Sequence, residues 1–185
     1  MRRNSALLRR ADRPTLPRMR EWEHGIIVAL NRYTITPLWK HLFAAVSRLG
    51  DGGLWLALAF ALIFLGGTRG VECVVHMFIA GAIALSVYKL CKHCASRPRP
   101  CVTLRNLHLC VQPLDEFSFP SGHTLHAVAF TTVAVAYFPD LALALVPFAV
   151  LTALSRVALG LHYPSDVLGG AVIGGGVALL SFSFG

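Results

Sequence analysis

Residues 155–166 are the segment best equipped for chemistry, and they read SRVALGLHYPSD. Only three residues carry a formal charge between position 120 and the C-terminus, namely Asp140, Arg156 and Asp166. Two of these flank His162, and charges in so apolar a region usually pair with each other or with a ligand because they are costly to desolvate. Asp166 can accept the Nδ1 proton of His162, which would leave Nε2 free as a nucleophile. The alternative is a buried Arg–Asp pair beside a core histidine.

Residues 120–123, Pro-Ser-Gly-His, open a predicted helix that runs to Phe138. Ser121 is a suitable N-cap, and Gly122 allows the backbone to approach a ligand closely. The free amides and the positive dipole end of such a helix form an anion site. His123 could then give a proton to a leaving oxygen. The alternative is ordinary helix capping with an incidental histidine.

Basic side chains form a third group, in which Lys92 precedes Arg99-Pro100 and the pair Arg97-Pro98 lies between them. The prolines hold the backbone extended, and guanidinium and ammonium groups on one stiff loop suit a phosphate. The alternative is a basic loop beside a membrane. The neighbouring polar residues are interpreted by default as solvated or packing side chains: Lys89, His93, Arg97, Arg105, His108, Asp115, Glu116 and His126.

The composition is that of a membrane protein, with 55% hydrophobic and 14% charged residues. Soluble domains carry about 25% charged residues. The long apolar stretches are residues 54–67, 71–90, 124–138, 141–154 and 167–184. Most of them approach the roughly 20 residues that span a bilayer as a helix. We therefore expect an all-α, polytopic membrane protein in which residues 21–185 form a single domain with one long polar loop, residues 92–119.

Arginine is concentrated in residues 1–20, which contribute much of the formal net charge of +8. A nucleic-acid partner is not expected, because in a membrane protein such a segment is typical of a disordered cytoplasmic tail facing lipid. Residues 49–53, Leu-Gly-Asp-Gly-Gly, indicate a turn. Residues 21–48 either cross the membrane or lie in its interface. Crossing would place the three candidate groups on the extracytoplasmic side, opposite the tail, and an interfacial segment would reverse that assignment.

The cysteines do not form a convincing metal site. Cys91 and Cys94 have C-x-x-C spacing, but no second pair at zinc-ribbon spacing follows. A Cys101–Cys110 disulfide is possible in an oxidising compartment, and free thiols are the alternative. We expect no metal and no cofactor.

Together the three groups resemble the type 2 phosphatidic acid phosphatase superfamily. Its signature is Lys-x6-Arg-Pro, then Pro-Ser-Gly-His, then Ser-Arg-x5-His-x3-Asp. The sequence contains all three parts without departure, beginning at Lys92, Pro120 and Ser155. The resemblance implies a membrane core of about six helices and metal-independent phosphoryl transfer through a phosphohistidine.

Carried over by position, the resemblance makes His162 the nucleophile, Asp166 the residue that orients it, and His123 the general acid and base. The residues that would hold the phosphate oxygens are Lys92, Arg99, Ser121, Gly122 and Arg156. The implied function is hydrolysis of a lipid phosphate or diphosphate in the bacterial inner membrane. Candidate lipids are phosphatidic acid, phosphatidylglycerol phosphate and undecaprenyl diphosphate. A lipid phosphotransferase and a non-catalytic protein that binds lipid phosphate are the alternatives.

Overall fold

The computed structural model describes residues 17–104, 107–108 and 115–184, and this part of the chain is helical without a β-strand. The longer helices are α2 (Pro17–Asn31), α3 (Pro37–Arg48), α4 (Leu54–Leu65), α5 (Gly67–Ala95), α7 (Gly122–Tyr137), α8 (Ala142–Ala158) and α9 (Pro164–Ser181). The shorter ones are η1 (Arg32–Ile35), η2 (Leu49–Gly53), α6 (Pro100–Thr103), η3 (Pro139–Leu141) and η4 (Phe182–Phe184). The predicted all-α class is confirmed.

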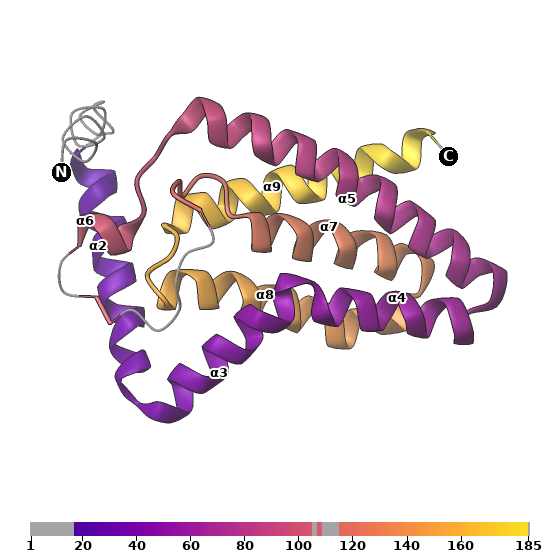
Figure 1. Cartoon of the computed structure of the whole chain (residues 1–185), viewed down its shortest axis with the longest axis horizontal. Coiled ribbons are helices and arrows are strands. Elements are labelled where there is room, and N and C mark those ends of the chain that lie inside the picture. Colours follow the sequence, from indigo (N-terminus) through magenta and orange to yellow (C-terminus); the bar gives the residue numbers. More distant parts are fainter. Residues whose placement is uncertain (1–16, 105–106, 109–114, 185) are drawn as a thin grey trace.

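Helix α7 is the centre of the bundle and packs against α5, α8 and α9 (Figure 1). Its inward residues Ala127, Ala129 and Val133 are fully buried. Small residues bring α9 very close to it: a Cβ on Gly174 would lie 2.2 Å from the Leu125 carbonyl oxygen, so only glycine fits. This approach holds the beginning of α7 against the beginning of α9, where two of the three candidate groups lie.

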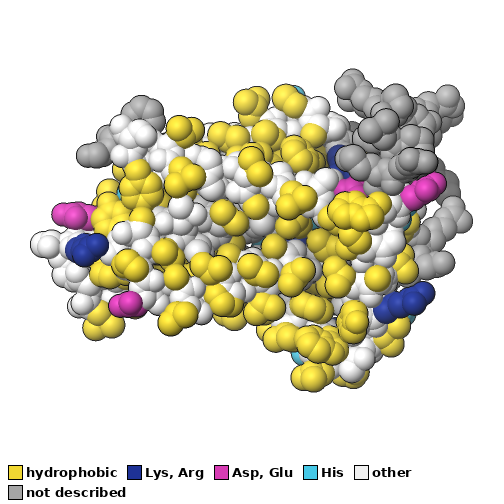
Figure 2. Space-filling view, turned by 180° about the vertical axis from the view of Figure 1, so that it is seen from behind, with side chains coloured by type: hydrophobic (Ala, Val, Ile, Leu, Met, Phe, Trp, Pro, Cys, Tyr) yellow, Lys and Arg dark blue, Asp and Glu magenta, His cyan; other side chains and the backbone are white. Residues whose placement is uncertain are grey.

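Within the described residues, four segments are long and apolar enough to cross a membrane: Pro37–Leu65, Gly67–Ala95, Pro139–Ala158 and Pro164–Ser181. Figure 2 shows hydrophobic side chains over the middle of one face, with the visible acidic and basic side chains at its two ends. Large apolar side chains such as Leu65 (86% exposed) and Leu143 (88%) would be costly to expose to water. The structure agrees with an integral membrane protein in which α7 is enclosed by lipid-facing helices.

Residues 49–53, the predicted turn, form a kink between two helices, α3 and α4. Gly52 takes a non-helical φ of 135°, and the Leu54 amide donates to the Leu49 carbonyl across the kink. Glycine accepts that conformation without steric cost, so the helix direction changes here. The two helices together form the apolar segment Pro37–Leu65, of 29 residues.

The N-terminal region also differs from the prediction. Residues 1–16 of the predicted tail lie outside the described residues, but residues 17–20 belong to α2, because proline is well tolerated in the first turn of a helix. Helix α2 lies across one end of the bundle and contacts α8 and α9 (Figure 1). Asn31, at its end, donates to the Ala158 carbonyl at 2.8 Å.

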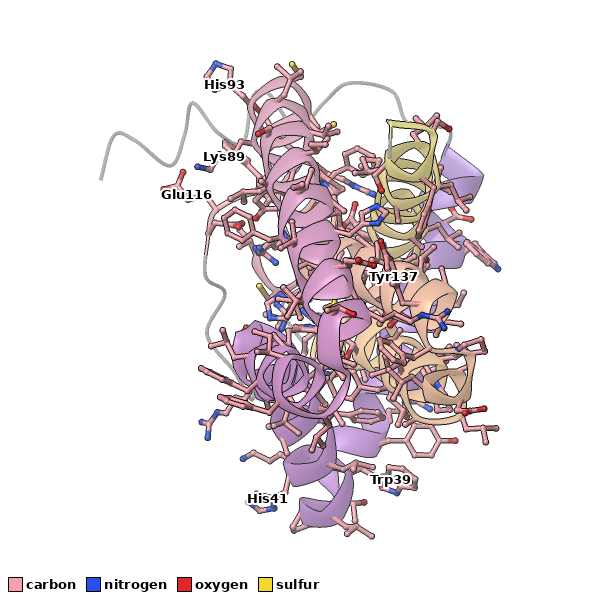
Figure 3. The ribbon with its side chains drawn as sticks, turned by 90° about the vertical axis from the view of Figure 1, so that its right-hand side faces the viewer. Trp39, His41, Lys89, His93, Glu116 and Tyr137 are labelled. Atoms are coloured by element: carbon pink, nitrogen blue, oxygen red, sulfur yellow. The ribbon has the colours of Figure 1, made fainter. Side chains whose placement is uncertain are left out.

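Residues 21–48 therefore combine both expected alternatives, since α2 lies across the end of the bundle and α3 begins the first spanning segment. The exposed aromatic side chains Trp22, Tyr33 and Trp39 suit a membrane interface. Trp39 and His41 project outward in Figure 3. Residue 17 thus lies at the end of the bundle that carries the candidate groups. The predicted arrangement, with tail and site on opposite sides of the membrane, requires a complete crossing by residues 21–48 and stays a prediction.

Candidate active site

The three candidate groups meet at the end of the bundle that α2 covers. Lys92 lies in the last turn of α5, and Arg99 directly precedes α6. Ser121 is the N-cap of α7. Arg156, on α8, and Asp166, on α9, lie on either side of the turn that carries His162. Backbone bonds hold these segments together. The Ser121 amide donates to the Asp166 carbonyl at 3.0 Å, and the His162 amide donates to the Arg156 carbonyl at 3.1 Å. All eight predicted site residues therefore belong to one region.

His162 is buried, with 2% of its surface exposed. Its Nδ1 lies 2.7 Å from the Ser118 carbonyl oxygen and 3.8 Å from Asp166 Oδ2. A carbonyl can only accept, so Nδ1 carries the proton and Nε2 is unprotonated. Arg99 Nη1 donates to Nε2 at 3.1 Å. The orienting partner is therefore the Ser118 carbonyl, with Asp166 further away, which corrects the predicted direct bond from Asp166.

Burial lowers the pKa of His162 to about 3, and the nearby charges of Arg99 and Arg156 act in the same direction. The imidazole is consequently neutral across the physiological range. A neutral imidazole with a free, inward-facing Nε2 is the form required for attack on phosphorus.

Asp166 is fully buried and has other bonds to make. Its Oδ2 accepts from the Tyr163 amide at 2.8 Å, in a capping box that begins α9. Its Oδ1 accepts from Arg97 Nη1 at 2.7 Å, while Arg97 Nη2 donates to Glu23 on α2 at 2.6 Å. Arg97 was expected to be a solvated loop charge, but it joins two buried carboxylates. Glu23 was not considered, because a single acid on an amphipathic helix does not reveal its partner.

Asp115 occupies the centre of the basic group. Arg99 Nη2 donates to Asp115 Oδ1 at 2.6 Å, Lys92 Nζ donates to the same oxygen, and the Tyr88 hydroxyl donates to Oδ2 at 2.7 Å. Burial alone would raise the pKa of Asp115, but these hydrogen bonds hold it well below its usual range. Lys92 also donates to the Phe117 carbonyl at 2.6 Å. A bound carboxylate shows that these donors converge on an anion, and the interpretation of Asp115 as a bystander is wrong.

His123 lies beside the anion site, at the start of α7. Its Nε2 is paired with Asp51 Oδ1, from the π-helical turn η2. Arg156 is buried, and its Nη1 donates to Ser47 Oγ on α3. Within the described part of the chain, Arg156 Nε has no hydrogen-bond partner. Neither Asp51 nor Ser47 was a sequence-based candidate.

A cavity of about 290 Å³ opens beside His123. Asp51 and Tyr88 line its polar part, and Trp55 and Phe130 line its apolar part. A Cβ on Gly122 would lie 2.8 Å from the Tyr88 ring, so glycine is required where α7 meets this cavity. A lipid whose head lies at the cations could extend its leaving group along this route.

Other polar residues do not join the site. Lys89, His93 and Glu116 are exposed and point away from the bundle (Figure 3), as expected. Among the described residues, no three His, Cys, Asp or Glu side chains gather as a metal site. Cys101 is a free thiol, and Cys110, the other half of the possible disulfide, lies outside the described residues.

Comparison with known proteins identifies the family. A model of the PAP2 superfamily matches residues 52–185, well over half of the chain. The chain belongs to the PAP2 superfamily. The predicted superfamily is thereby confirmed, and the matched region contains all three parts of the signature.

Several relatives are named as lipid phosphatases. Undecaprenyl-diphosphatase BcrC of Bacillus subtilis is 33% identical over 132 residues, which cover 69% of this chain and 68% of the relative. A lipid A 1-phosphatase of Rhizobium johnstonii is 26% identical over 162 residues, which cover 77% of this chain and 66% of the relative. The chain thus spans about two thirds of the length of these relatives.

Solved structures agree with the fold. The crystal structure of Aquifex aeolicus LpxE has a TM-score of 0.74 at 28% identity, covering 86% of this chain and 93% of that one. A transmembrane PAP2-type phosphatidylglycerolphosphate phosphatase from Bacillus subtilis has a TM-score of 0.73 at 24% identity, covering 96% of this chain and 91% of that one, and shows the fold alone. With the named relatives, these findings confirm the prediction of a membrane-embedded lipid phosphate phosphatase.

Proposed function

We propose that this protein removes the terminal phosphate of a polyprenyl diphosphate through a phosphohistidine at His162. The observation that carries the mechanism is the neutral His162 imidazole, whose unprotonated Nε2 accepts from Arg99 at 3.1 Å beside donors that already hold a carboxylate. Nucleophile and anion site therefore adjoin. Phosphoryl transfer needs mainly such positioning and charge stabilisation.

In the first step, the Nε2 lone pair attacks phosphorus while the bond from phosphorus to the leaving oxygen breaks. Protonated His123 gives its proton to that oxygen, which departs along the cavity. In the second step, His123 takes a proton from water as the water oxygen attacks phosphorus, and the P–N bond breaks to release phosphate and restore His162. Both steps balance without a metal or a redox partner.

The cations and the start of α7 hold the phosphoryl oxygens during both steps. The proposed binding residues are Lys92, Arg99, Ser121, Gly122 and Arg156. The Asp115 carboxylate bonds to Lys92 and Arg99, so substrate phosphate must displace it. Asp166 accepts from the Tyr163 amide at the start of α9 and from Arg97. Through these two bonds it stabilises the segment that carries His162.

Two observations support a polyprenyl diphosphate as substrate. One is the named activity of the Bacillus relative, and a second undecaprenyl-diphosphatase, from Sulfolobus acidocaldarius, is 26% identical over 76% of this chain. The other is the partly apolar cavity beside His123, which suits a lipid leaving group. The bacterial inner membrane remains the proposed location.

A phosphate-release panel tests this function. Purified protein in detergent is given undecaprenyl diphosphate, phosphatidic acid, phosphatidylglycerol phosphate and lipid A 1-phosphate, with His162→Ala as the control. We expect fastest release from the diphosphate, inhibition by vanadate and no effect of EDTA. Rapid acid quench at neutral pH should trap acid-labile phosphate on the wild type only. Label transferred to an organic acceptor would indicate a phosphotransferase, and binding without turnover would indicate a non-catalytic protein.

A further inference from the structure

The bent turn between α3 and α4 touches the reaction centre in two places, although neither contact belongs to the signature. Asp51 pairs with His123, and Ser47 accepts from Arg156. Both residues precede position 52, where the match to the family model begins. We propose that Asp51 and Ser47 are positioning residues, Asp51 holding His123 as general acid and Ser47 holding Arg156 for the phosphate. This inference rests on the roles proposed above for His123 and Arg156.

The turn is built to reach both partners. Ser47 and Asp51 are four residues apart, a spacing that places side chains on the same face of a helix. A Cβ on Gly50 would lie 3.3 Å from Thr152 Cγ2 and 3.6 Å from His123 Cδ2, so the turn is packed directly against α7 and α8. The kink at Gly52, whose φ is 135°, follows Ser47 and Asp51 directly and turns the chain beside the site.

Asp51 is a carboxylate within an apolar 29-residue segment. A charge at such a position is expensive and is usually retained for a functional pairing. Its partner in the structure is His123 Nε2, which leaves Nδ1 as the nitrogen that can give a proton to the leaving oxygen. Burial and the nearby charge of Arg156 lower the pKa of His123 to about 4, and the Asp51 carboxylate acts in the opposite direction by favouring the protonated imidazole, the form that a general acid requires. The charged and titratable groups around His123 are Asp51, Arg156 and His126, with Tyr88 lining the same cavity.

Ser47 serves a different purpose. It is buried, with 1% of its surface exposed, and its hydroxyl oxygen fixes one edge of the Arg156 guanidinium. The buried Nε of Arg156 has no partner in the described part of the chain, so it remains available to an anion. Ser47 thus holds one edge of the guanidinium group, and the Nε donor of Arg156 can bind a phosphate oxygen. Arg156 and His123 are thus positioned by one helix face.

The two roles predict opposite kinetic signatures. Protonation of the leaving oxygen matters for a poor leaving group, such as the alkoxide of phosphatidic acid, and little for p-nitrophenolate. Asp51→Asn should therefore lower kcat for phosphatidic acid by about 10- to 100-fold and for p-nitrophenyl phosphate by less than about threefold, and it should shift the pH optimum for phosphatidic acid downward. Ser47→Ala should raise KM by a similar factor for both substrates. Asp140→Asn, an exposed acid between α7 and α8, is the matched control.

A double-mutant cycle separates positioning from general damage. If Asp51 acts through His123, Asp51→Asn in a His123→Ala background should cost less than about twofold on phosphatidic acid, the substrate with the poor leaving group. An equal loss in both backgrounds, or an equal loss on both leaving groups, would overturn the role of Asp51. An Asp51→Glu variant that restores the pH profile supports it. Wild-type protein that releases no phosphate from any lipid would refute the proposed function and this inference together, whereas an active wild type with an unaltered Asp51→Asn variant refutes the inference alone.

Discussion

The two histidines of the site differ in their location and in their hydrogen-bond partners, although both are proposed to act in the same reaction. His162 is buried in a turn, and its Nδ1 donates to a backbone carbonyl from Ser118. His123 lines a cavity at the start of α7 and pairs with a carboxylate from the first spanning segment. A neutral carbonyl fixes the tautomer of a nucleophile without charging it. The Asp51 carboxylate favours the charged imidazole that an acid requires, and it acts against the burial that lowers the pKa of His123 to about 4.

The comparison shows how one protein can set two identical side chains to opposite tasks. The partners differ in charge and in origin: one is backbone from the loop before α7, and the other is a side chain from the bend between α3 and α4. The predictions below probe this difference, beginning with the largest expected effect.

Removal of the nucleophile should have the largest effect. His162→Ala is expected to lower kcat by at least about 10⁴-fold, because no other group can form the covalent intermediate. Phosphate release measures this loss, and an unchanged unfolding temperature shows that the fold is retained. A variant that keeps a tenth of the activity would mean that the two histidines do not divide the work as described.

Arg99 distinguishes the nucleophile half of the site, because it donates to both His162 and the anion site. Arg99→Ala should lower kcat/KM by about 10²- to 10³-fold, in line with the loss of a donor that stabilises transition-state charge. Arg99→Lys keeps the charge but loses the planar fork, so it should recover only part of the activity. Full recovery with lysine would show that geometry at Arg99 is unimportant.

The protonation state of His162 offers a direct test of the contrast. Because burial lowers the pKa of His162 to about 3, its imidazole should stay neutral, with the proton on Nδ1, from about pH 4 upward. Nitrogen NMR of the labelled protein can follow both ring nitrogens. The acid limb of kcat/KM would then belong to the substrate or to another group. Titration of His162 near pH 6.5 would contradict the assignment of a neutral nucleophile.

Arg97 should matter mainly for stability, since it bridges the buried carboxylates of Glu23 and Asp166. Arg97→Ala leaves both carboxylates without this cation and should lower the free energy of unfolding by about 3 kcal/mol. Thermal unfolding in detergent measures this change. Lys89→Ala, which removes an exposed charge nearby, should cost less than about 0.5 kcal/mol. Equal effects of the two variants would rule out a special role for the Arg97 bridge.

Asp115 should produce the smallest effect. Its carboxylate competes with phosphate for Lys92 and Arg99, and about a third of its side chain is exposed. Asp115→Asn should strengthen inhibition by phosphate by about two- to fivefold, the range expected for a partly exposed ion pair. Weaker inhibition would mean that Asp115 mainly holds the cations in place. The measurement is the inhibition constant at fixed ionic strength.

Much of the site could be predicted from the sequence, because each part of the signature is defined by residue types at a fixed spacing. His123, His162 and the binding cations come together as expected. The missed residues share one property: their partners are distant in sequence. Asp51 lies among glycines that indicate a turn, and only the packing of the bend against α7 reveals its contact with His123. Asp115 is one acid in a polar loop, and no local pattern reveals that cations surround it.

In the fold, too, features set by local sequence could be predicted, and features set by contacts between distant segments could not. Apolar stretches predicted the helices from α4 onward, because long runs of such residues have few alternatives in a membrane. The glycines at residues 49–53 predicted the break between α3 and α4, because glycine accepts the positive φ that Gly52 adopts. Hydropathy could not predict how the two helices are placed on either side of this kink. Packing decides their placement, and together they form one apolar segment.

The position of α2 determines which compartment a reporter would see. Residue 17 lies at the catalytic end of the bundle, and α9 ends at the opposite end (Figure 1). A pH-sensitive fluorophore or a protease tag placed just before α2 would therefore share the aqueous compartment in which phosphate is released. The same reporter placed after α9 would sit across the bilayer from that compartment.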